Sequence, residues 1–169
     1  MKNTVIAAAL ALSMLPTLAS AGTVKFPEEA PSISINIPES WEPAETDGYL
    51  ECTSPDDVAT LYFQVVASKK ESDKVIGEFI DWLVEEHQVK IDAATQKTAD
   101  VDVAGRTWGS ISWDGASKEY GPAKVGFWST VLGDGKVLIA SFWISKKDSE
   151  KSLATIEGKI FPSVKPIKE

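Results

Sequence analysis

The residue types that most often carry out chemistry are either scarce in this sequence or spaced wrongly for it. The chain has one histidine, His87, and one cysteine, Cys52. A Cys–His pair or a Ser–His–Asp group would have to use His87, and no pattern brings a nucleophile near it. Cys52 is interpreted as a small buried core residue. The alternative is a reactive thiol or an intermolecular disulfide, since a single cysteine cannot form an internal one.

Acidic residues are common and could in principle hold a metal or cleave a glycosidic bond. Asp56 and Asp57 are adjacent in a predicted turn, and Asp114 and Glu119 sit in a later loop region. A calcium loop needs several oxygen ligands at set spacing, which neither segment has. Glycoside hydrolysis needs two carboxyls at a controlled separation, one of them with a raised pKa. We therefore interpret these acids as solvated turn residues and predict no metal and no cofactor.

Aromatic residues give a more informative pattern. Trp108 is expected to share a strand face with Ser110 and Ser112. A face that mixes large aromatic and small polar side chains suits a ligand or a partner, because Trp and Tyr combine apolar area with a polar group. The candidate residues of this surface are Tyr62, Trp108, Trp128 and Trp143, with Trp41 and Tyr120 as candidates in loops.

The favoured alternative is that a helix covers this face and that its aromatic residues form a second core. We expect Trp143 to be buried, because it lies in the most apolar run, and Trp108 to be partly exposed. The residues expected on the opposite, core-facing side are Ile111, Phe127, Leu138, Phe142 and Ile144. Because the register between strands cannot be read from sequence, the shared aromatic face is a hypothesis.

Alternation of polar and apolar residues predicts a series of strands. They are Ser32–Ile37, Tyr49–Thr53, Ala59–Val66, Thr107–Asp114, Lys124–Leu132 and Lys136–Ser145. Asp134-Gly135 predicts a tight two-residue hairpin turn between the last two strands, because this dipeptide accepts positive φ. Ala104-Gly105 predicts another turn.

Two amphipathic helices are predicted from apolar residues at three-to-four spacing. Ser72 or Asp73 is expected to cap the first helix. Its apolar stripe consists of Val75, Ile76, Phe79, Trp82 and Leu83. Asp148-Ser149 is expected to cap the second helix, and Pro162 to end it.

Together these elements predict a single α+β domain. Adjacent strands joined by short turns favour a mainly antiparallel β-sheet, flanked by helices that cover at least one of its faces. Residues 22–30 are expected to be a loose lead-in because of their prolines, and residues 89–102 are ambiguous. We find no internal repeat and no linker, and 169 residues suit one core.

Several segments resemble the PsbP-like superfamily, which contains extrinsic photosystem II subunits, a eukaryotic Ran-binding import factor and DcrB-like envelope proteins. The first is the strand, proline and tryptophan of residues 35–41 (INIPESW). The others are the hairpin ending in residues 139–142 (IASF) and the closing helix with residues 160–165 (IFPSVK). The resemblance covers residues 32–165 and implies an antiparallel sheet between helices, an α/β/α sandwich. It also implies an accessory or binding role without catalysis, and it assigns no role to single residues.

The N-terminal segment predicts export from the cell. Residues 5–18 are mainly apolar after a basic Lys2, and residues 19–21 (ASA) form a small-residue cleavage site. The apolar run is shorter than the roughly 20 residues that span a bilayer. We therefore predict a cleaved signal peptide, residues 1–21, and one mature domain, residues 22–169. Its expected location is the periplasm or the extracellular medium, without stable membrane insertion.

The net charge of −8 disfavours nucleic acid and anionic membrane surfaces as partners, because like charges repel. The leading hypothesis is an exported, non-catalytic accessory module that binds an unidentified protein or a small apolar ligand. One alternative is a secreted hydrolase with an acidic active site, which would need a pocket lined by carboxyls of raised pKa. Another is an envelope protein that protects its own cell from a toxin.

Overall fold

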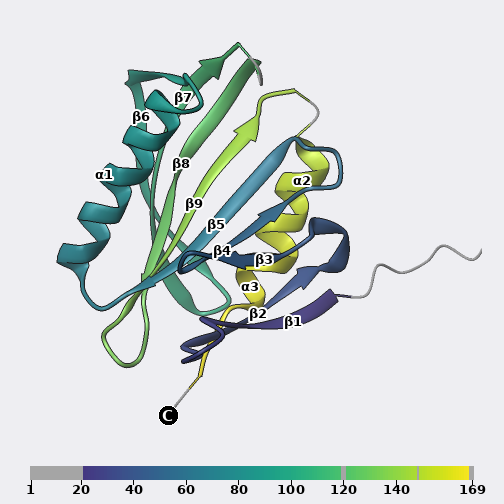
Figure 1. Ribbon diagram of the computed structural model, residues 1–169, viewed down its shortest axis with the longest axis vertical. Coiled ribbons are helices and arrows are strands. Elements are labelled where there is room, and N and C mark those ends of the chain that lie inside the picture. The colour runs from purple at the N-terminus through teal and green to yellow at the C-terminus, as the bar shows by residue number, and fades with distance from the viewer. Residues whose placement is uncertain (1–20, 119–120, 148, 168–169) are drawn as a thin grey trace, which may run out of the picture.

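The computed structural model describes residues 21–118, 121–147 and 149–167. The predictions for the signal-peptide residues 1–20, and for Glu119, Tyr120 and Asp148, therefore lie outside the described residues. Within the described ranges the chain folds into two antiparallel sheets, and helices cover both faces of the larger sheet (Figure 1).

In the described part of the chain the larger sheet has seven strands, in the spatial order β3-β4-β5-β9-β8-β7-β6. They are β3 (Ala44–Thr46), β4 (Tyr49–Thr53), β5 (Ala59–Val66), β6 (Lys90–Val103), β7 (Arg106–Ser117), β8 (Gly121–Val131) and β9 (Val137–Ser145). Each strand runs antiparallel to its neighbours. The predicted α+β class with a mainly antiparallel sheet is confirmed.

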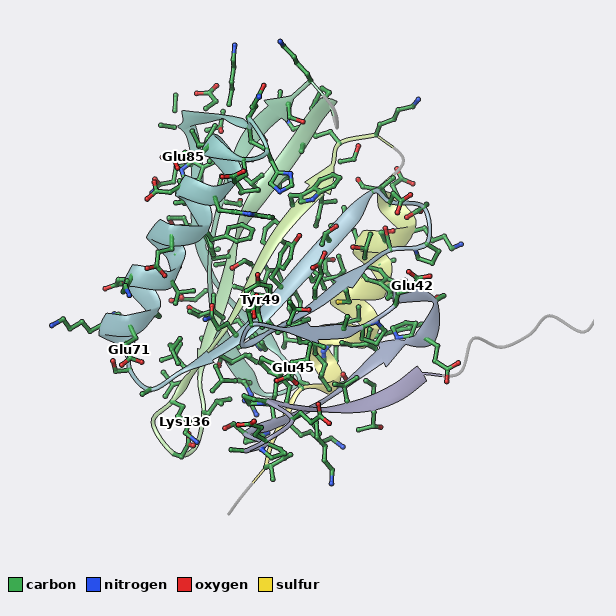
Figure 2. All side chains as sticks on the ribbon, in the orientation of Figure 1. Glu42, Glu45, Tyr49, Glu71, Glu85 and Lys136 are labelled. Atoms are coloured by element: carbon green, nitrogen blue, oxygen red, sulfur yellow. The ribbon has the colours of Figure 1, made fainter. Side chains whose placement is uncertain are left out.

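Helix α1 (Lys69–Glu85) covers one face of this sheet. Ser68 caps it by accepting a hydrogen bond from the backbone N–H of Glu71, and the Glu71 carboxylate accepts one from the N–H of Ala67 at 2.9 Å. The helix therefore begins before the predicted cap at Ser72, because its first turn is polar and leaves no apolar periodicity to read. Figure 2 shows Glu71 and Glu85 at the two ends of α1.

The other face is covered by a C-terminal helix in three segments: α2 (Glu150–Thr155), the π-helical turn η2 (Ile156–Ile160) and α3 (Phe161–Ser163). The prediction that Pro162 ends the helix is wrong by one residue. The N–H of Phe161 bonds to the carbonyl of Ile156, five residues back. This wider turn changes the hydrogen-bond register just before Pro162, whose ring would clash inside a regular α-helix.

A smaller sheet packs beside the C-terminal helix and consists of β1 (Ala21–Phe26), β2 (Ile33–Pro38) and β10 (Lys165–Pro166). The expectation of a loose lead-in at residues 22–30 is wrong for its first part, since β1 pairs along its length with β2. Phe26 and Ile35 are fully buried in the main core. This strand escapes prediction because it is short and depends on pairing with β2 rather than on its own pattern.

Two hairpin turns lie where the sequence predicted them, but their details differ from the prediction. Residues 90–103, which the sequence left ambiguous, form β6, and Ala104 and Gly105 turn with positive φ values of 52° and 77°. Between β8 and β9 the N–H of Gly135 bonds to the carbonyl of Leu132 at 3.0 Å. The loop is therefore three residues long rather than two, and of these three only Gly135 has a positive φ, at 86°.

Candidate functional site

The predicted aromatic face is divided between the two faces of the main sheet. Tyr62 lies opposite Ser141 in the β5–β9 pairing, and with Trp143 it faces α1. Trp108 and Trp128 pack instead against Phe161 of the C-terminal helix, with ring centroids 5.1 and 4.5 Å away. The hypothesis of one shared face is therefore wrong, because the strand registers place the alternating residues of different strands on opposite sides.

The degree of burial also differs from expectation. Trp108, expected to be partly exposed, is fully buried, and Trp41, a loop candidate, is 3% exposed in the short 3-10 turn η1 (Glu39–Trp41). The small neighbours of Trp108 do not mark a solvent face, since Phe161 packs directly over its ring. Trp143 is partly buried and packs beside Leu83 of α1.

The expected core residues are likewise divided between the two faces. Ile111 and Phe127 pack against α1. Leu138, Phe142 and Ile144 belong to the core under the C-terminal helix. Use of any predicted residue as a ligand surface stays a prediction.

A large hollow, which we term the C-terminal cavity, lies between the sheet and the C-terminal helix. Its volume is about 590 Å³. Its apolar wall consists of Leu61, Trp128, Phe142, Ile144, Leu153, Ile156 and Phe161. The Trp128 and Phe161 rings are stacked, with an interplanar angle of 15°. Ser110 and Ser112, the small residues that the sequence pattern singled out, line it from β7.

Polar and charged groups gather at one edge of the C-terminal cavity. Lys146 forms an ion pair with Asp114 at 2.7 Å, and Lys124 and Ser145 line the same cavity. The hydrogen bond from Lys146 holds the pKa of Asp114 below its usual range, and the positive charge of Lys124 acts in the same direction. Ser149 and Glu157 also line the cavity, from the C-terminal segment. The cavity therefore combines an apolar wall with polar and charged groups, which suits an amphipathic molecule.

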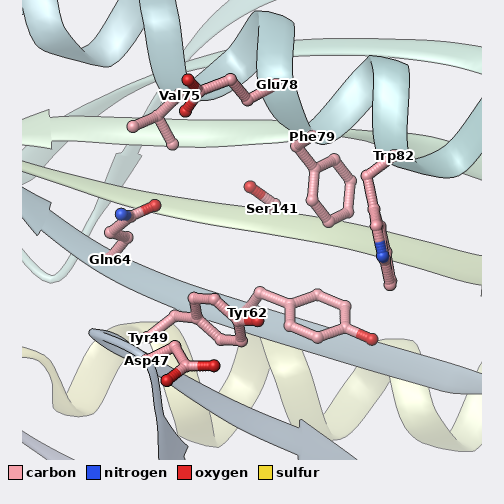
Figure 3. Close-up of a pocket in the computed structure, with 9 residues that line it drawn as sticks. All are labelled: Asp47, Tyr49, Tyr62, Gln64, Val75, Glu78, Phe79, Trp82 and Ser141. Carbon is pink, nitrogen blue, oxygen red and sulfur yellow. The ribbon is translucent and has the colours of Figure 1, made fainter.

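A second hollow, which we term the α1 groove, lies on the opposite face between α1 and strands β4, β5 and β9. Its volume is about 320 Å³. Figure 3 shows its lining: Asp47, Tyr49, Tyr62, Gln64, Val75, Glu78, Phe79, Trp82 and Ser141. Of these residues only Tyr62 was a predicted site residue. Phe79 and Trp82 were assigned to the apolar stripe of the helix, and no sequence signal places Asp47 or Tyr49 beside them.

The other residues considered for catalysis, Cys52 and His87, have surroundings typical of structural residues. Cys52 is fully buried in the main core, and burial raises the pKa of its thiol, which favours the core interpretation. His87 packs against the Trp82 ring with centroids 4.2 Å apart. Among the described residues no group of three or more His, Cys, Asp or Glu side chains is placed to hold a metal ion. None of the described helices is long and apolar enough to cross a membrane.

Comparison with solved structures identifies the architecture. Cyanobacterial PsbP (CyanoP) from Synechocystis sp. PCC 6803 superposes with a TM-score of 0.56 at 10% sequence identity, over 89% of this chain and 94% of that one. The fold is PsbP-like. The resemblance stated from the sequence is confirmed at the level of the fold.

The other comparisons do not extend the assignment beyond the PsbP-like fold. The Ran-binding protein Mog1p from Saccharomyces cerevisiae matches with a TM-score of 0.43 at 11% identity, over 86% of this chain and 96% of that one. No protein-family model matches the sequence, and a search of curated proteins gives no match.

Proposed function

We propose that this protein is an exported, non-catalytic binding protein of a bacterial cell envelope, which holds a small apolar or amphipathic molecule in the C-terminal cavity. The observation that carries the proposal is the cavity itself. Its volume of about 590 Å³ falls within the roughly 300–1,000 Å³ of typical small-molecule pockets. An apolar wall with a few polar groups at one edge is the usual composition of such pockets.

The apolar wall favours a ligand with a hydrocarbon body. Phe142 and Ile144 belong to the sheet, and Leu153 and Ile156 face them from the C-terminal helix. Enclosing a hydrocarbon chain here gains about 25 cal/mol for each Å² of apolar surface removed from water. Lys124 at the edge offers a positive charge for a carboxylate or phosphate head group.

The export part of the proposal rests on the N-terminal sequence. A cut after Ala21 would leave Gly22 as the first residue of the mature chain. β1 pairs Gly22 with Ile37 and continues to Phe26, so a mature chain of this length keeps almost the whole strand. Mass spectrometry of the protein from a periplasmic or culture fraction is expected to give a chain that begins at Gly22. An intact N-terminus starting at Met1 would contradict export by this route.

Ligand binding is tested by native mass spectrometry of the protein purified from its own cells, followed by solvent extraction. A co-purifying small molecule is expected, and titration with a long-chain fatty acid should quench the fluorescence of Trp128, assigned with the Trp128→Phe variant. Ser112→Phe should abolish binding by filling the cavity, whereas Ser112→Ala should not. Equal binding by both variants would place the ligand elsewhere, and recovery only of a stable protein complex would favour a protein partner.

The hydrolase alternative finds no supporting observation in the described part of the chain. A general acid needs a raised carboxyl pKa. Three carboxyls have lowered pKa values: Asp56 through a hydrogen bond from Ser54, Asp114 through Lys146, and Asp134 through Lys136. These shifts stabilise the ionised forms, which is opposite to what that mechanism requires. Nothing in the structure favours the toxin-protection alternative over the binding function.

A further inference from the structure

The α1 groove has a different chemistry from the C-terminal cavity, and it supports a second site. We propose that the α1 groove binds a small organic cation of the alkylated-ammonium class, held between aromatic rings and carboxylates. This site goes beyond the proposed function, because it lies on the other face of the sheet and takes a ligand of opposite character.

Aromatic rings form two walls of the groove. Tyr49 and Tyr62 stand on the strands, and Phe79 and Trp82 project from α1 toward them (Figure 3). The Tyr62 ring lies 5.6 Å from both the Phe79 and the Trp82 rings, and 6.1 Å from the Tyr49 ring. These rings pack against one another edge-on or tilted. A cation in the groove that comes within about 6 Å of a ring face would be attracted by the ring quadrupole, most strongly by that of tryptophan.

The charges around the groove are negative. Asp47 and Glu78 line it, and none of the nine described residues that line it is basic. A third carboxylate, that of Glu51, accepts a hydrogen bond from the Tyr62 hydroxyl at 3.4 Å. A competing cation is Lys74, whose Nζ lies 3.3 Å from Glu78 on the solvent-exposed surface of α1. An incoming cation would meet Asp47 and would compete with Lys74 for Glu78.

The size and the polar groups of the groove limit the ligand further. Its volume of about 320 Å³ lies near the lower end of the usual range for ligand pockets, so a small molecule fits better than a folded partner. Gln64 and Ser141 at its floor can hydrogen-bond a ligand hydroxyl or carbonyl. A bare metal ion prefers several convergent oxygen or nitrogen ligands, whereas four of the nine residues that line this groove are aromatic.

The first experiment uses choline as the probe, with its uncharged isostere, in which carbon replaces the quaternary nitrogen, as the control. Titrations by calorimetry and by the indole N–H resonance of Trp82 are expected to show saturable binding of choline. The isostere should bind about tenfold more weakly, because it has the same shape without the charge. Equal binding of both would overturn the cation site, and so would no binding of either. Tighter binding of a blocked lysine would overturn the small-molecule assignment in favour of a protein side chain.

Variants of the full chain separate the site from the general negative charge of the protein. Asp47→Asn removes a charge inside the groove and suits the positive φ of 48° at this position. Asp81→Asn removes one from exposed α1 surface outside the lining residues. The first should weaken choline binding at least about threefold, as expected for a charge a few ångströms away, and the second should leave it unchanged. Equal weakening would contradict the site.

One further variant predicts an increase in affinity, which damage to the fold cannot produce. Lys74→Gln removes the competing cation from Glu78, and the exposed Lys74 side chain contributes little to packing. Choline should therefore bind more tightly, by about twofold or more, in line with the modest strength of an exposed ion pair. An unchanged or weaker affinity would show that Glu78 takes no part in binding.

Tyr49 tests the aromatic wall itself. Tyr49→Leu keeps apolar volume but removes a ring, and should weaken choline binding several-fold, whereas Tyr49→Phe should preserve it. Unchanged affinity in Tyr49→Leu would exclude this ring from the site, and loss in Tyr49→Phe would point to the hydroxyl instead.

Discussion

The two faces of the main sheet carry similar side chains but bury them to different extents. On the face under the C-terminal helix, Trp108 is fully buried and Trp128 stacks on Phe161. On the α1 face, Tyr62 and Trp82 are only partly buried and line a groove. Both faces therefore have an aromatic cluster with a hollow beside it, and they differ in that the face under the C-terminal helix also encloses a fully buried tryptophan.

The difference comes from the layers that cover each face. The C-terminal helix and the smaller sheet together close one face, and the largest core cluster lies there, including Phe26 and Ile35 of the smaller sheet. The other face is covered by the single helix α1, whose contacts with the sheet form two smaller clusters. The exposure of a strand residue therefore depends on the covering layer as well as on the alternation of its own strand.

Among variants that test this difference between the two faces, Trp108→Ala is expected to have the largest effect on stability. Removing a fully buried tryptophan typically lowers the free energy of unfolding by about 3–5 kcal/mol. Trp82→Ala on the α1 face should cost clearly less, because Trp82 is only partly buried. Urea unfolding of both variants measures the difference. Equal losses would mean that the two aromatic clusters have the same structural role.

A smaller effect is expected from Gly126→Ala, which perturbs the floor of the C-terminal cavity. A Cβ at this position would collide with the backbone carbonyl of Ile111, and it would lie 2.9 Å from the Phe142 ring. Overpacking of this kind typically costs about 1–3 kcal/mol. The matched control is Gly109→Ala, whose new Cβ would meet its nearest atoms at an ordinary 3.7 Å. Calorimetric melting should show a clear loss for the first variant and little or none for the second.

Residues within single elements could be assigned from sequence more reliably than relations between elements. The predicted strand Ala59–Val66 forms β5 with the same bounds, and Ala104-Gly105 correctly marked a turn. The prediction that Trp108 and Tyr62 share a face failed because it required the relative register of four strands, β5, β9, β8 and β7. Each one-residue shift in register exchanges the two faces.

The candidate sites were less predictable for the same reason. Ser110 and Ser112, which the sequence pattern singled out, line the C-terminal cavity, and the favoured expectation that a helix covers the face of Trp108 holds there. Asp47 and Tyr49 reach the α1 groove only because a tight turn carries β3 back along β4. Asp47 and Tyr49 are far from Trp82 in sequence, so their position beside it depends on the whole fold.

The hairpin loop of residues 133–135 joins β8 and β9, which contribute residues to both faces of the sheet. A change in this loop should therefore weaken the aromatic clusters on both faces. Gly135→Val places a β-branched residue at a φ of 86°, which costs about 1–2 kcal/mol. Asp134→Val should cost less, because Asp134 has no positive φ and its exposed side chain pairs with the neighbouring Lys136. Thermal unfolding distinguishes the two. A larger loss in Asp134→Val would mean that the side-chain contacts, not the backbone angle, hold the loop.

The smallest effect concerns the ion pair at the edge of the C-terminal cavity. Lys146→Met removes the partner of Asp114, and both side chains are more than a third exposed, so the loss at neutral pH should be small. Lys146 lowers the pKa of Asp114 in the folded protein. The unfolded chain therefore binds its proton at higher pH than the folded chain does. The stabilisation is fully present above the ordinary aspartate pKa of about 4 and is lost as the pH falls through the lower, folded value.

The pH dependence therefore separates the charge of Lys146 from the packing of its hydrocarbon chain. The stability difference between wild type and Lys146→Met should be present at neutral pH, shrink in strong acid and also shrink at high salt, where exposed charges are screened. Urea unfolding at two pH values and two salt concentrations measures it. A difference that is constant under all four conditions would mean that Lys146 supports the cavity edge by packing. In that case the edge of the C-terminal cavity, like its wall, would be held by apolar contacts.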